Sequence, residues 1–285
     1  MKKTVKSILK SVGLLKPARS LFKRNLSAEQ AHAQKYQHIF TWVLNRKGVE
    51  VTYDLKDPYS KRWFLPRYAD GNIHEPAATD VFIDYIEKDS VVLDIGGHLG
   101  YFSCLAASLA SNGSVHVFEV DPKCITLIEQ NSAINNFENI IINNMAVSNQ
   151  NGLETIPVMD NPNPSLVINS SESGIEVQAI RIDDYIEKHG VVPDFIKIDV
   201  EGAEWKVLQG MSTLLENAKL TLLVEIHVNN LIDFFDTNYQ EIIAFLKVKG
   251  FSIKKLNTHR EDSSNLLKVE EETKLEGNTM ILCTK

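Results

Sequence analysis

The chain has 285 residues, 44% of them hydrophobic and 24% charged, which is typical of one large globular domain with an appendage. Its formal net charge of -7 at pH 7 argues against a nucleic-acid partner. Cys104, Cys124 and Cys283 are too few and too scattered for a disulfide framework or a zinc site, so we expect a reducing, cytoplasmic setting.

Residues 1–24 differ from the rest of the chain because they are basic and periodically apolar. All the charged residues before Glu29 are lysines or arginines, and hydrophobic residues recur at helical spacing from Val5 to Leu15. The segment is typical of a helix lying on an anionic membrane face, as at the inner membrane, or of a solvated extension docked on its own acidic domain. No apolar run approaches the ~20 residues that cross a bilayer.

We expect residues 1–70 to form this basic amphipathic extension and a cap, and residues 71–285 to form the main domain. The cap is rich in aromatic residues. These rings either form a small apolar core or stack on a sugar ring. They include Tyr53, Tyr59, Trp63, Phe64 and Tyr68.

From Val91 onward, strand-like and helix-like segments alternate, which predicts an α/β domain with a parallel sheet. The predicted strands are 91–95, 114–119, 140–143, 195–199, 220–226, 251–256 and 279–283. The predicted helices are 101–110, 121–135, 204–209 and 239–249. Between Gly152 and Asp183, two strand-like stretches predict a β-hairpin around a polar loop, residues 160–174.

Polar residues follow five of the predicted strands at their carboxyl ends, where open parallel sheets bind ligands. In chain order they are Asp94 with Gly96, Gly97 and Gly100; Glu119; Asn144 to Ala146; Asp199 and Glu201; and Glu225 and His227. Because strand ends in the middle of a sheet are partly buried, unpaired charge there is costly. We therefore interpret these acids as a ligand site.

The stretch VVLDIGGHLGYF, residues 91–102, spaces its glycines G-G-x-x-G and not G-x-G-x-x-G. Gly96 and Gly100 permit a tight turn and a close approach to a ligand, but His98 makes the loop bulky for a pyrophosphate. The loop better suits a nucleoside carrying an amino acid. Asp94 would receive its ammonium group and Glu119 its ribose hydroxyls. This combination predicts S-adenosylmethionine.

At this point the chain resembles the FkbM-type methyltransferases of the class I S-adenosylmethionine-dependent superfamily. The resemblance covers about residues 74–230, and its most specific stretch is KIDVEGAE. The other matching stretches are HEPAATDVFIDYI, VVLDIGGHLGYFS, VFEVDP, NMAVSN, AIRIDDYI and LLVEIH. It implies an α/β, Rossmann-like fold with a seven-stranded, mostly parallel sheet, an antiparallel last strand and helices on both faces. A β-hairpin insert and an N-terminal helical extension complete the expected fold.

The resemblance implies O-methyl transfer to a hydroxyl of a glycan or glycosylated metabolite, such as a surface polysaccharide precursor. A hydroxyl is a poor nucleophile, so transfer needs alignment and a nearby base. Asp199 and His227 are the candidate bases, with Glu201 and Glu225 as positioning groups. The expected cofactor contacts are Asp94, Gly96, Gly97, His98, Gly100, Glu119, Asn144, Ala146, Asp199 and Glu75.

Several alternatives remain open from the sequence. The chain could be an NAD-dependent oxidoreductase or a non-catalytic scaffold. Asp199 or Glu201 could cap the following helix, Glu204 is expected to do so, and His227 could be structural. Asp199, Glu201 and Glu225 could hold magnesium, but no compact ligand motif is present and we expect no metal. The sequence predicts no oligomeric state.

Overall fold

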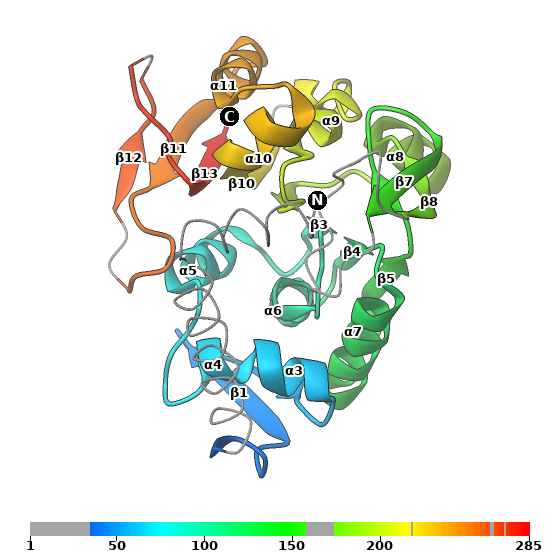
Figure 1. Ribbon diagram of the computed structural model, residues 1–285, viewed down its shortest axis with the longest axis vertical. Helices are drawn as coiled ribbons and strands as arrows, with labels where there is room; N and C mark the ends of the chain where they lie inside the picture. Colours follow the sequence, from blue (N-terminus) through cyan, green and yellow to red (C-terminus); the bar gives the residue numbers. More distant parts are fainter. Residues whose placement is uncertain (1–34, 158–173, 218, 263–264, 271) are drawn as a thin grey trace, which may run out of the picture. The chain divides into compact units, whose positions relative to one another are not determined.

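The computed structural model describes residues 35–157, 174–217, 219–262, 265–270 and 272–285 (Figure 1). The basic segment 1–24 and nearly all of the predicted polar loop lie outside this part of the chain. None of the helices in the described ranges combines the length and apolarity that a bilayer crossing requires.

The chain forms two compact units. The larger comprises Val43–Tyr53 and His74–Lys285, and the described part of the smaller comprises residues 35–42 and Asp54–Ile73. The short strands β1 (Thr41–Arg46) and β2 (Val49–Asp54) pair with each other. The smaller unit contains helices α3 (Pro58–Trp63) and α4 (Leu65–Tyr68).

Aromatic rings form the core of the smaller unit. The Phe64 and Tyr68 rings stack with centroids 4.1 Å apart, and the Trp42 ring meets the Phe64 ring edge-on at 5.3 Å. Phe64 and Tyr68 are both buried, with 0% and 2% of their surface exposed. These two side chains therefore form an apolar core and do not offer free faces for a sugar.

The larger unit is built on an eight-stranded sheet with the order β12-β11-β13-β10-β9-β3-β4-β5. Its strands are β3 (Val91–Ile95), β4 (Ser114–Phe118), β5 (Ile140–Asn143), β9 (Phe195–Ile198), β10 (Thr221–His227), β11 (Ser252–Leu256), β12 (Leu266–Lys268) and β13 (Asn278–Thr284). Strands β10, β9, β3, β4 and β5 run parallel, whereas β13 is antiparallel to both β10 and β11. This order confirms the predicted Rossmann-like fold with an antiparallel last strand.

The sheet has one strand more than the seven expected. After β11 the chain turns back, and β12 pairs antiparallel with it from Lys254–Lys268 to Leu256–Leu266. The three residues of β12 are all exposed, so they show no alternation of buried and exposed side chains. A strand without that pattern gives no signal in the sequence.

Helices cover both faces of the sheet, as predicted. They are α5 (Pro76–Tyr85), α6 (Tyr101–Leu109), α7 (Pro122–Asn135), α8 (Ile182–His189), α9 (Glu204–Gln209), α10 (Val228–Phe235) and α11 (Tyr239–Val248), with a 3₁₀ turn at Leu214–Glu216. Strand β9 contacts helices on both faces of the sheet, because successive side chains of a strand point to opposite faces. Ile196 and Ile198 join the core with residues of α8, α9 and α11. On the other face, Phe195 contacts Phe82 of α5 at 5.0 Å between ring centroids.

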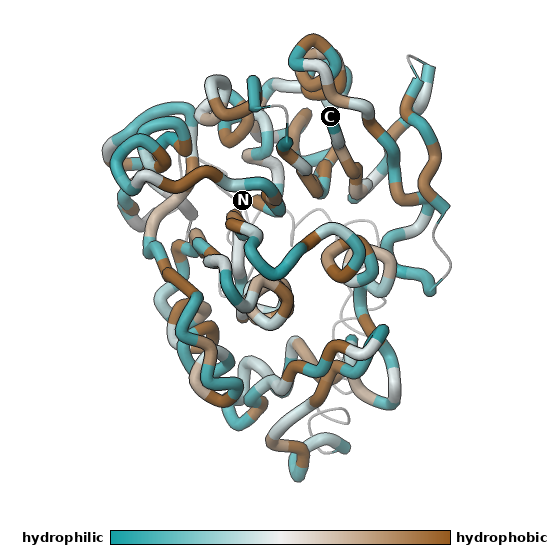
Figure 2. The backbone as a smooth tube through the Cα atoms, turned by 180° about the vertical axis from the view of Figure 1, so that it is seen from behind, coloured by the Kyte–Doolittle hydropathy of each residue, from teal (hydrophilic) through white to brown (hydrophobic). Residues whose placement is uncertain are grey.

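Hydrophobic residues dominate the centre of this unit. Figure 2 shows brown stretches along α6 and around the C-terminus, where β10 and β13 lie. In β10, every residue after Thr221 is buried, which explains its nearly continuous apolar run.

The predicted β-hairpin is present as a separate three-stranded sheet. Strands β7 (Gly152–Pro157) and β8 (Gly174–Ile180) pair antiparallel, and β6 (Ala146–Val147) runs parallel to β8. The three-stranded sheet therefore begins at Ala146, directly after the segment that contains Asn144.

Candidate active site

The polar strand ends meet at one edge of the central sheet. Strands β4, β3, β9 and β10 are consecutive neighbours in the sheet and run parallel. Their carboxyl ends therefore bring together Asp94, Glu119, Asp199 and His227, residues that lie up to 133 positions apart in the sequence (227 - 94). This is the arrangement that the sequence predicted.

The glycine loop after β3 packs directly against the end of β9. Gly96 has a φ of 87°, and a Cβ atom at this position would lie 1.9 Å from the Asp199 carbonyl oxygen. At Gly97 a Cβ atom would lie 2.3 Å from Cγ1 of Val117. Both positions therefore require glycine for close approach. Gly100 precedes α6 as its N-cap residue.

His98 adopts a left-handed conformation, with a φ of 50°. Its backbone N–H donates to Glu119 Oε2 at 2.7 Å. The two other donors to this carboxylate, the N–H groups of Val120 and Asp121, lie 2.7 and 2.9 Å from Oε1. Burial raises the pKa of Glu119 to about 7, although these hydrogen bonds oppose the shift. The carboxylate is thus fixed in orientation at the end of β4.

Asp94 is completely buried, with 0% of its surface exposed. Its Oδ2 accepts a hydrogen bond from the Ser103 hydroxyl at 2.5 Å. Its Oδ1 has no hydrogen-bond partner among the described residues and lies 3.8 Å from Lys197 Nζ. Burial raises the pKa of Asp94, and the Lys197 charge opposes that shift. Asp94 therefore keeps one oxygen available for a donor.

Lys197 lies in the middle of β9 and is 2% exposed. Its Nζ donates to Asp199 Oδ2 at 3.1 Å. Burial alone would lower the pKa of this ammonium, but the Asp199 and Asp94 charges outweigh it, so the pKa is raised. Burial acts in the opposite sense on Asp199, yet Lys197 and His227 hold the Asp199 pKa at about 2. The buried Lys197 ammonium and the partly exposed Asp199 carboxylate form an ion pair at the centre of the site.

His227, at the end of β10, is held by three acids. Its Nδ1 lies 2.7 Å from Glu204 Oε1, and since a carboxylate only accepts, the imidazole is the donor. Its Nε2 lies 3.4 Å from Glu201 Oε2 and 3.9 Å from Asp199 Oδ1. Burial would lower the His227 pKa, but the Glu204 hydrogen bond and the nearby acids raise it to about 10. His227 is therefore an imidazolium at neutral pH.

This result changes the role expected for His227. The sequence indicates His227 as one of two candidate bases, beside Asp199, but a protonated imidazole donates and does not accept. Asp199 and Glu201 do not cap α9, whose N-cap residue is Ala203 without a side-chain cap bond. Glu204, which was expected to cap α9, instead accepts from the N–H of Gly202, which precedes the helix, at 2.9 Å, and also holds His227. The sequence missed this second contact.

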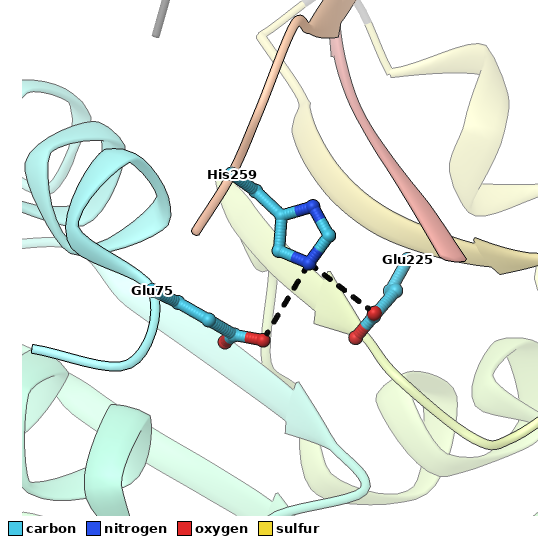
Figure 3. A group of neighbouring side chains, drawn as sticks. All are labelled: Glu75, Glu225 and His259. Carbon is cyan, nitrogen blue, oxygen red and sulfur yellow. Dashed lines mark ion pairs between the residues drawn. The ribbon is translucent and has the colours of Figure 1, made fainter. Parts of the chain in front are cut away.

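Glu225 belongs to a different group of side chains. It lies with Glu75, the N-cap residue of α5, and with His259, which follows β11 (Figure 3). Burial raises the Glu75 pKa to about 7 and raises the Glu225 pKa well above its ordinary value, with a further contribution from the Asp199 charge. Burial lowers the His259 pKa to about 4. No motif in the sequence had indicated His259.

A cavity of about 510 Å³ lies beside this group, and His259 forms part of its wall. Three further wall residues are basic: Lys255, Arg260 and Lys274. One wall residue, Glu276, is acidic. The cavity therefore carries a positive charge next to the acidic strand ends.

The two remaining predicted contacts lie on the far side of Glu119. Asn144 is exposed and donates through Nδ2 to the Glu119 carbonyl oxygen at 3.0 Å. Ala146 is buried in β6. Both lie on the segment that leads from β5 to the insert.

A sequence comparison identifies the family. The sequence model of the methyltransferase FkbM domain matches residues 94–253, which is more than half of the chain. The chain belongs to the FkbM methyltransferase family. This membership favours S-adenosylmethionine over NAD, so the oxidoreductase alternative is not retained. The matched residues begin at Asp94, within β3, and extend into β11.

The residues of this FkbM domain fit S-adenosylmethionine, the cofactor of the family. The free, buried Oδ1 of Asp94 is suited to an ammonium donor. The close approach at Gly96 and Gly97 leaves backbone but no side chain at the turn. Glu119 offers a fixed carboxylate on the next strand. Nothing in this set resembles a pyrophosphate cradle.

The FkbM chain is also similar to individual proteins. It is 28% identical over 151 residues to the hexuronic acid methyltransferase AglP of Haloferax volcanii, a match that covers 52% of this chain and 60% of that protein. A structure of methyltransferase FkbM from Methylobacillus flagellatus KT matches with a TM-score of 0.45 and 15% identity over 91% of this chain and 59% of that one. The precorrin-6y C5,15-methyltransferase of Geobacter metallireducens GS-15 matches with a TM-score of 0.43 and 14% identity, over 74% and 87%.

Proposed function

We propose that this protein transfers a methyl group from S-adenosylmethionine to a hydroxyl of an acidic glycan, one that contains a uronic acid. The observation that supports an acidic acceptor is the cavity beside the strand-end acids, which is lined by Lys255, Arg260 and Lys274. Membership of the FkbM family supports methyl transfer. The similarity to a hexuronic acid methyltransferase supports a uronic acid acceptor.

The chain's own residues would hold the cofactor at the ends of β3 and β4. Asp94 Oδ1 would accept from the ammonium group, and the Gly96–Gly97 turn would leave room for the amino-acid moiety. Glu119 would accept from the ribose hydroxyls, since each of its oxygens keeps acceptor capacity beside the backbone donors. When bound, S-adenosylmethionine supplies an electrophilic methyl group on a sulfonium.

The basic cavity would hold the acceptor's carboxylate. Lysine and arginine donors make charge-assisted hydrogen bonds to carboxylates, and a guanidinium can bind one with two parallel bonds. A volume of about 510 Å³ lies within the range of small-molecule sites. A neutral sugar would make none of these charged contacts, so we expect the protein to discriminate against it.

We assign the proton-accepting role to Asp199. Its carboxylate is 25% exposed and lies at the end of β9, next to the glycine turn. An acceptor hydroxyl loses its proton readily only as the new C–O bond forms and its oxygen gains positive charge. A carboxylate with a low pKa is then a sufficient base. Lys197 and His227 would hold Asp199 in place, and Glu201 would orient the hydroxyl.

The test is a transfer assay with methyl-labelled S-adenosylmethionine. The acceptors are oligosaccharides that contain glucuronic acid, the same oligosaccharides with the carboxyl groups reduced to alcohols, and neutral glucans. We expect label only on the uronic acid series. Equal labelling of the reduced series would contradict the role of the basic cavity, and no labelling of any carbohydrate would contradict the glycan proposal.

The stability of the product separates two kinds of methylation. A methyl ether on a hydroxyl survives mild alkali, whereas a methyl ester on the carboxyl group is hydrolysed. We expect the label to stay on the sugar after alkaline treatment. A label released by alkali would show carboxyl methylation and would remove the need for Asp199 as a base.

A non-catalytic scaffold remains the second candidate, and it makes a different prediction. It requires that Asp199→Ala and His227→Ala leave the biological function intact. Calorimetry with S-adenosylmethionine and then with the acceptor separates binding from transfer. Tight binding of both without any labelled product would favour the scaffold.

We further propose that residues 1–24 make peripheral contact with an anionic membrane surface. The support is the unbroken series of basic residues before Glu29 and the apolar residues at helical spacing. Deletion of residues 1–24 is expected to reduce the amount of protein that sediments with anionic liposomes and to leave the amount that sediments with neutral liposomes unchanged. Equal sedimentation of the full and shortened chains would contradict this role.

A further inference from the structure

Glu75, Glu225 and His259 form a compact buried group from three distant parts of the sequence (Figure 3). Glu75 precedes α5, Glu225 lies in β10, and His259 follows β11. Their exposed fractions are 7%, 3% and 6%. His259 Nε2 points between the two carboxylates, 3.8 Å from Glu75 Oε1 and 3.5 Å from Glu225 Oε1.

These separations are too long for direct hydrogen bonds, which span ~2.7–3.2 Å. They do match two ligands of one metal ion. Ligand bonds of ~2.0–2.2 Å at tetrahedral angles place neighbouring ligand atoms about 3.4 Å apart. The three ligand atoms all lie within 4.8 Å of one another. The Glu225–His259 separation of 3.5 Å is close to this value, and the other separations are somewhat longer, so the three side chains would have to move slightly to share one ion.

Two of these ligand atoms are left unsatisfied. Glu225 Oε1 and His259 Nε2 are both buried and have no hydrogen-bond partner among the described residues. Each belongs to a side chain that is more than nine-tenths buried. Buried polar atoms without a partner are rare because they forgo the hydrogen bonds of water. Two such atoms that face each other indicate a common ligand.

The charges around the group point the same way. Within ion-pair distance of the two carboxylates, the structure as described has one arginine or lysine, Arg260, whose Nη2 lies 3.7 Å from Glu225 Oε1. The Arg260 side chain is 50% exposed, so water weakens this contact. When both carboxyl groups are ionised, this partly exposed arginine is the one lysine or arginine of the described residues within ion-pair distance, and a divalent cation would neutralise them.

The neighbouring group of Asp199, Glu201 and His227 has similar dimensions but a different balance of positive and negative charge. There Lys197 pairs with Asp199 at 3.1 Å. Glu204 binds His227 Nδ1 at 2.7 Å, and His227 itself serves as the cation for Glu201. Its charges are paired with one another and with Lys197 and Glu204, although His227 Nε2 is also buried without a hydrogen-bond partner among the described residues. This group therefore has less need of a metal ion and serves as the comparison.

We propose that Glu75, Glu225 and His259 bind a divalent first-row transition-metal ion. Carboxylate oxygens suit manganese and imidazole suits zinc and iron, so the mixed set favours these ions over calcium, which takes 6–8 oxygens. Three protein ligands leave coordination positions free. Because His259 also lines the basic cavity, the metal site would lie next to a ligand bound there. The metal site goes beyond the proposed methyl transfer and does not depend on it.

The test measures metal binding directly, without cofactor or acceptor. The full chain is stripped with a chelator, dialysed and titrated with Mn²⁺, and free Mn²⁺ is counted by electron paramagnetic resonance. We expect uptake of one ion per chain. Since loss of an outer-shell partner already weakens metal sites by ~10–100-fold, Glu75→Gln, Glu225→Gln and His259→Gln should each weaken binding at least ~10-fold.

Glu201→Gln is the matched control, because it removes a carboxylate from the neighbouring group with similar dimensions. We expect it to bind Mn²⁺ as the unchanged chain does. Circular dichroism and thermal unfolding without metal show which variants are folded. A folded Glu225→Gln chain that binds Mn²⁺ normally would overturn the proposal. So would the absence of Mn²⁺ or Zn²⁺ uptake by the unchanged chain, or loss of binding in Glu201→Gln alone.

Discussion

Lys197 offers the sharpest test of how the site is held together. Its ammonium is buried between Asp199, 3.1 Å away, and Asp94, 3.8 Å away. Lys197→Met keeps an unbranched side chain of similar length and removes the charge together with the hydrogen bond to Asp199. The two acids would then lie beside each other at the strand ends without their cation.

The size of the effect follows from burial. The side chains of Lys197 and Asp94 are 3% and 1% exposed, so water cannot replace the lost cation there. Removing one partner of a buried ion pair typically destabilises a protein by ~3–5 kcal/mol. For a chain of this length, each kcal/mol lowers the melting temperature by roughly 2–4 °C, so we expect a decrease of roughly 6–20 °C.

The assay is thermal and chemical unfolding of the full chain and of three variants. Lys268→Met is the control, because Lys268 pairs with Glu270 at 2.7 Å while 71% exposed, and an exposed pair contributes about 0–1 kcal/mol. Asp199→Asn added to Lys197→Met should restore part of the stability, since it removes one uncompensated charge. A loss below about 1 kcal/mol in Lys197→Met would refute the buried ion pair as a structural requirement.

Three further predictions concern the cofactor loop, the base and a titrating acid. Gly96→Ala should weaken S-adenosylmethionine binding by roughly tenfold or more in calorimetry, because its Cβ meets the Asp199 carbonyl oxygen at 1.9 Å; Gly190→Ala, also at positive φ but with no atom within 4 Å, should not. Asp199→Asn should lower kcat by ~10²–10⁴-fold in the transfer assay with less change in cofactor affinity, and a smaller loss would place the base elsewhere. Because the folded pKa of Glu119 is raised from 4.5 to about 7, the folded state holds that proton more tightly. Its stabilising contribution is complete below pH 4.5 and is lost as the pH rises through about 7, so the unfolding free energy of the unchanged chain relative to Glu119→Gln should fall over that range and then level off.

Much of the sheet was predictable because its strands are buried on both faces. Strands such as β10 appear as apolar runs in the sequence, and α7 begins as predicted with Asp121 as a cap that accepts from the Lys123 N–H. Some helices were missed. Helix α8 was missed although Ile182, Tyr185 and Ile186 recur at helical spacing and Gly190 ends it, because the stretch from Gly152 to Asp183 was interpreted as a β-hairpin. Helix α10 starts directly at the end of β10 without a side-chain cap. A helix that begins without a capping residue gives a weak signal in the sequence.

The placement of site residues was predictable where it follows from the order of the parallel strands. A parallel sheet aligns its carboxyl ends, so the acids after β3, β4 and β9 had to converge. His259 was not predictable, because it lies in a loop that follows β11 and reaches Glu225 only through tertiary packing. The protonation of His227 was not predictable either. It depends on Glu204, which looked like a helix cap and is completely buried beside the imidazole.

The charge distribution gives each proposed ligand its own place. S-adenosylmethionine carries positive charge on its sulfonium and ammonium groups, and acids occupy the strand ends where it would lie. A uronic acid is negative, and Lys255, Arg260 and Lys274 line the cavity beyond His259. A negative acceptor would be repelled from the acidic edge and drawn to the basic cavity, which favours one orientation of the pair. Methyl transfer removes the sulfonium charge, so the acidic edge would hold the spent cofactor less strongly than the fresh one. The same acids would thereby favour both binding of the substrate and release of the product.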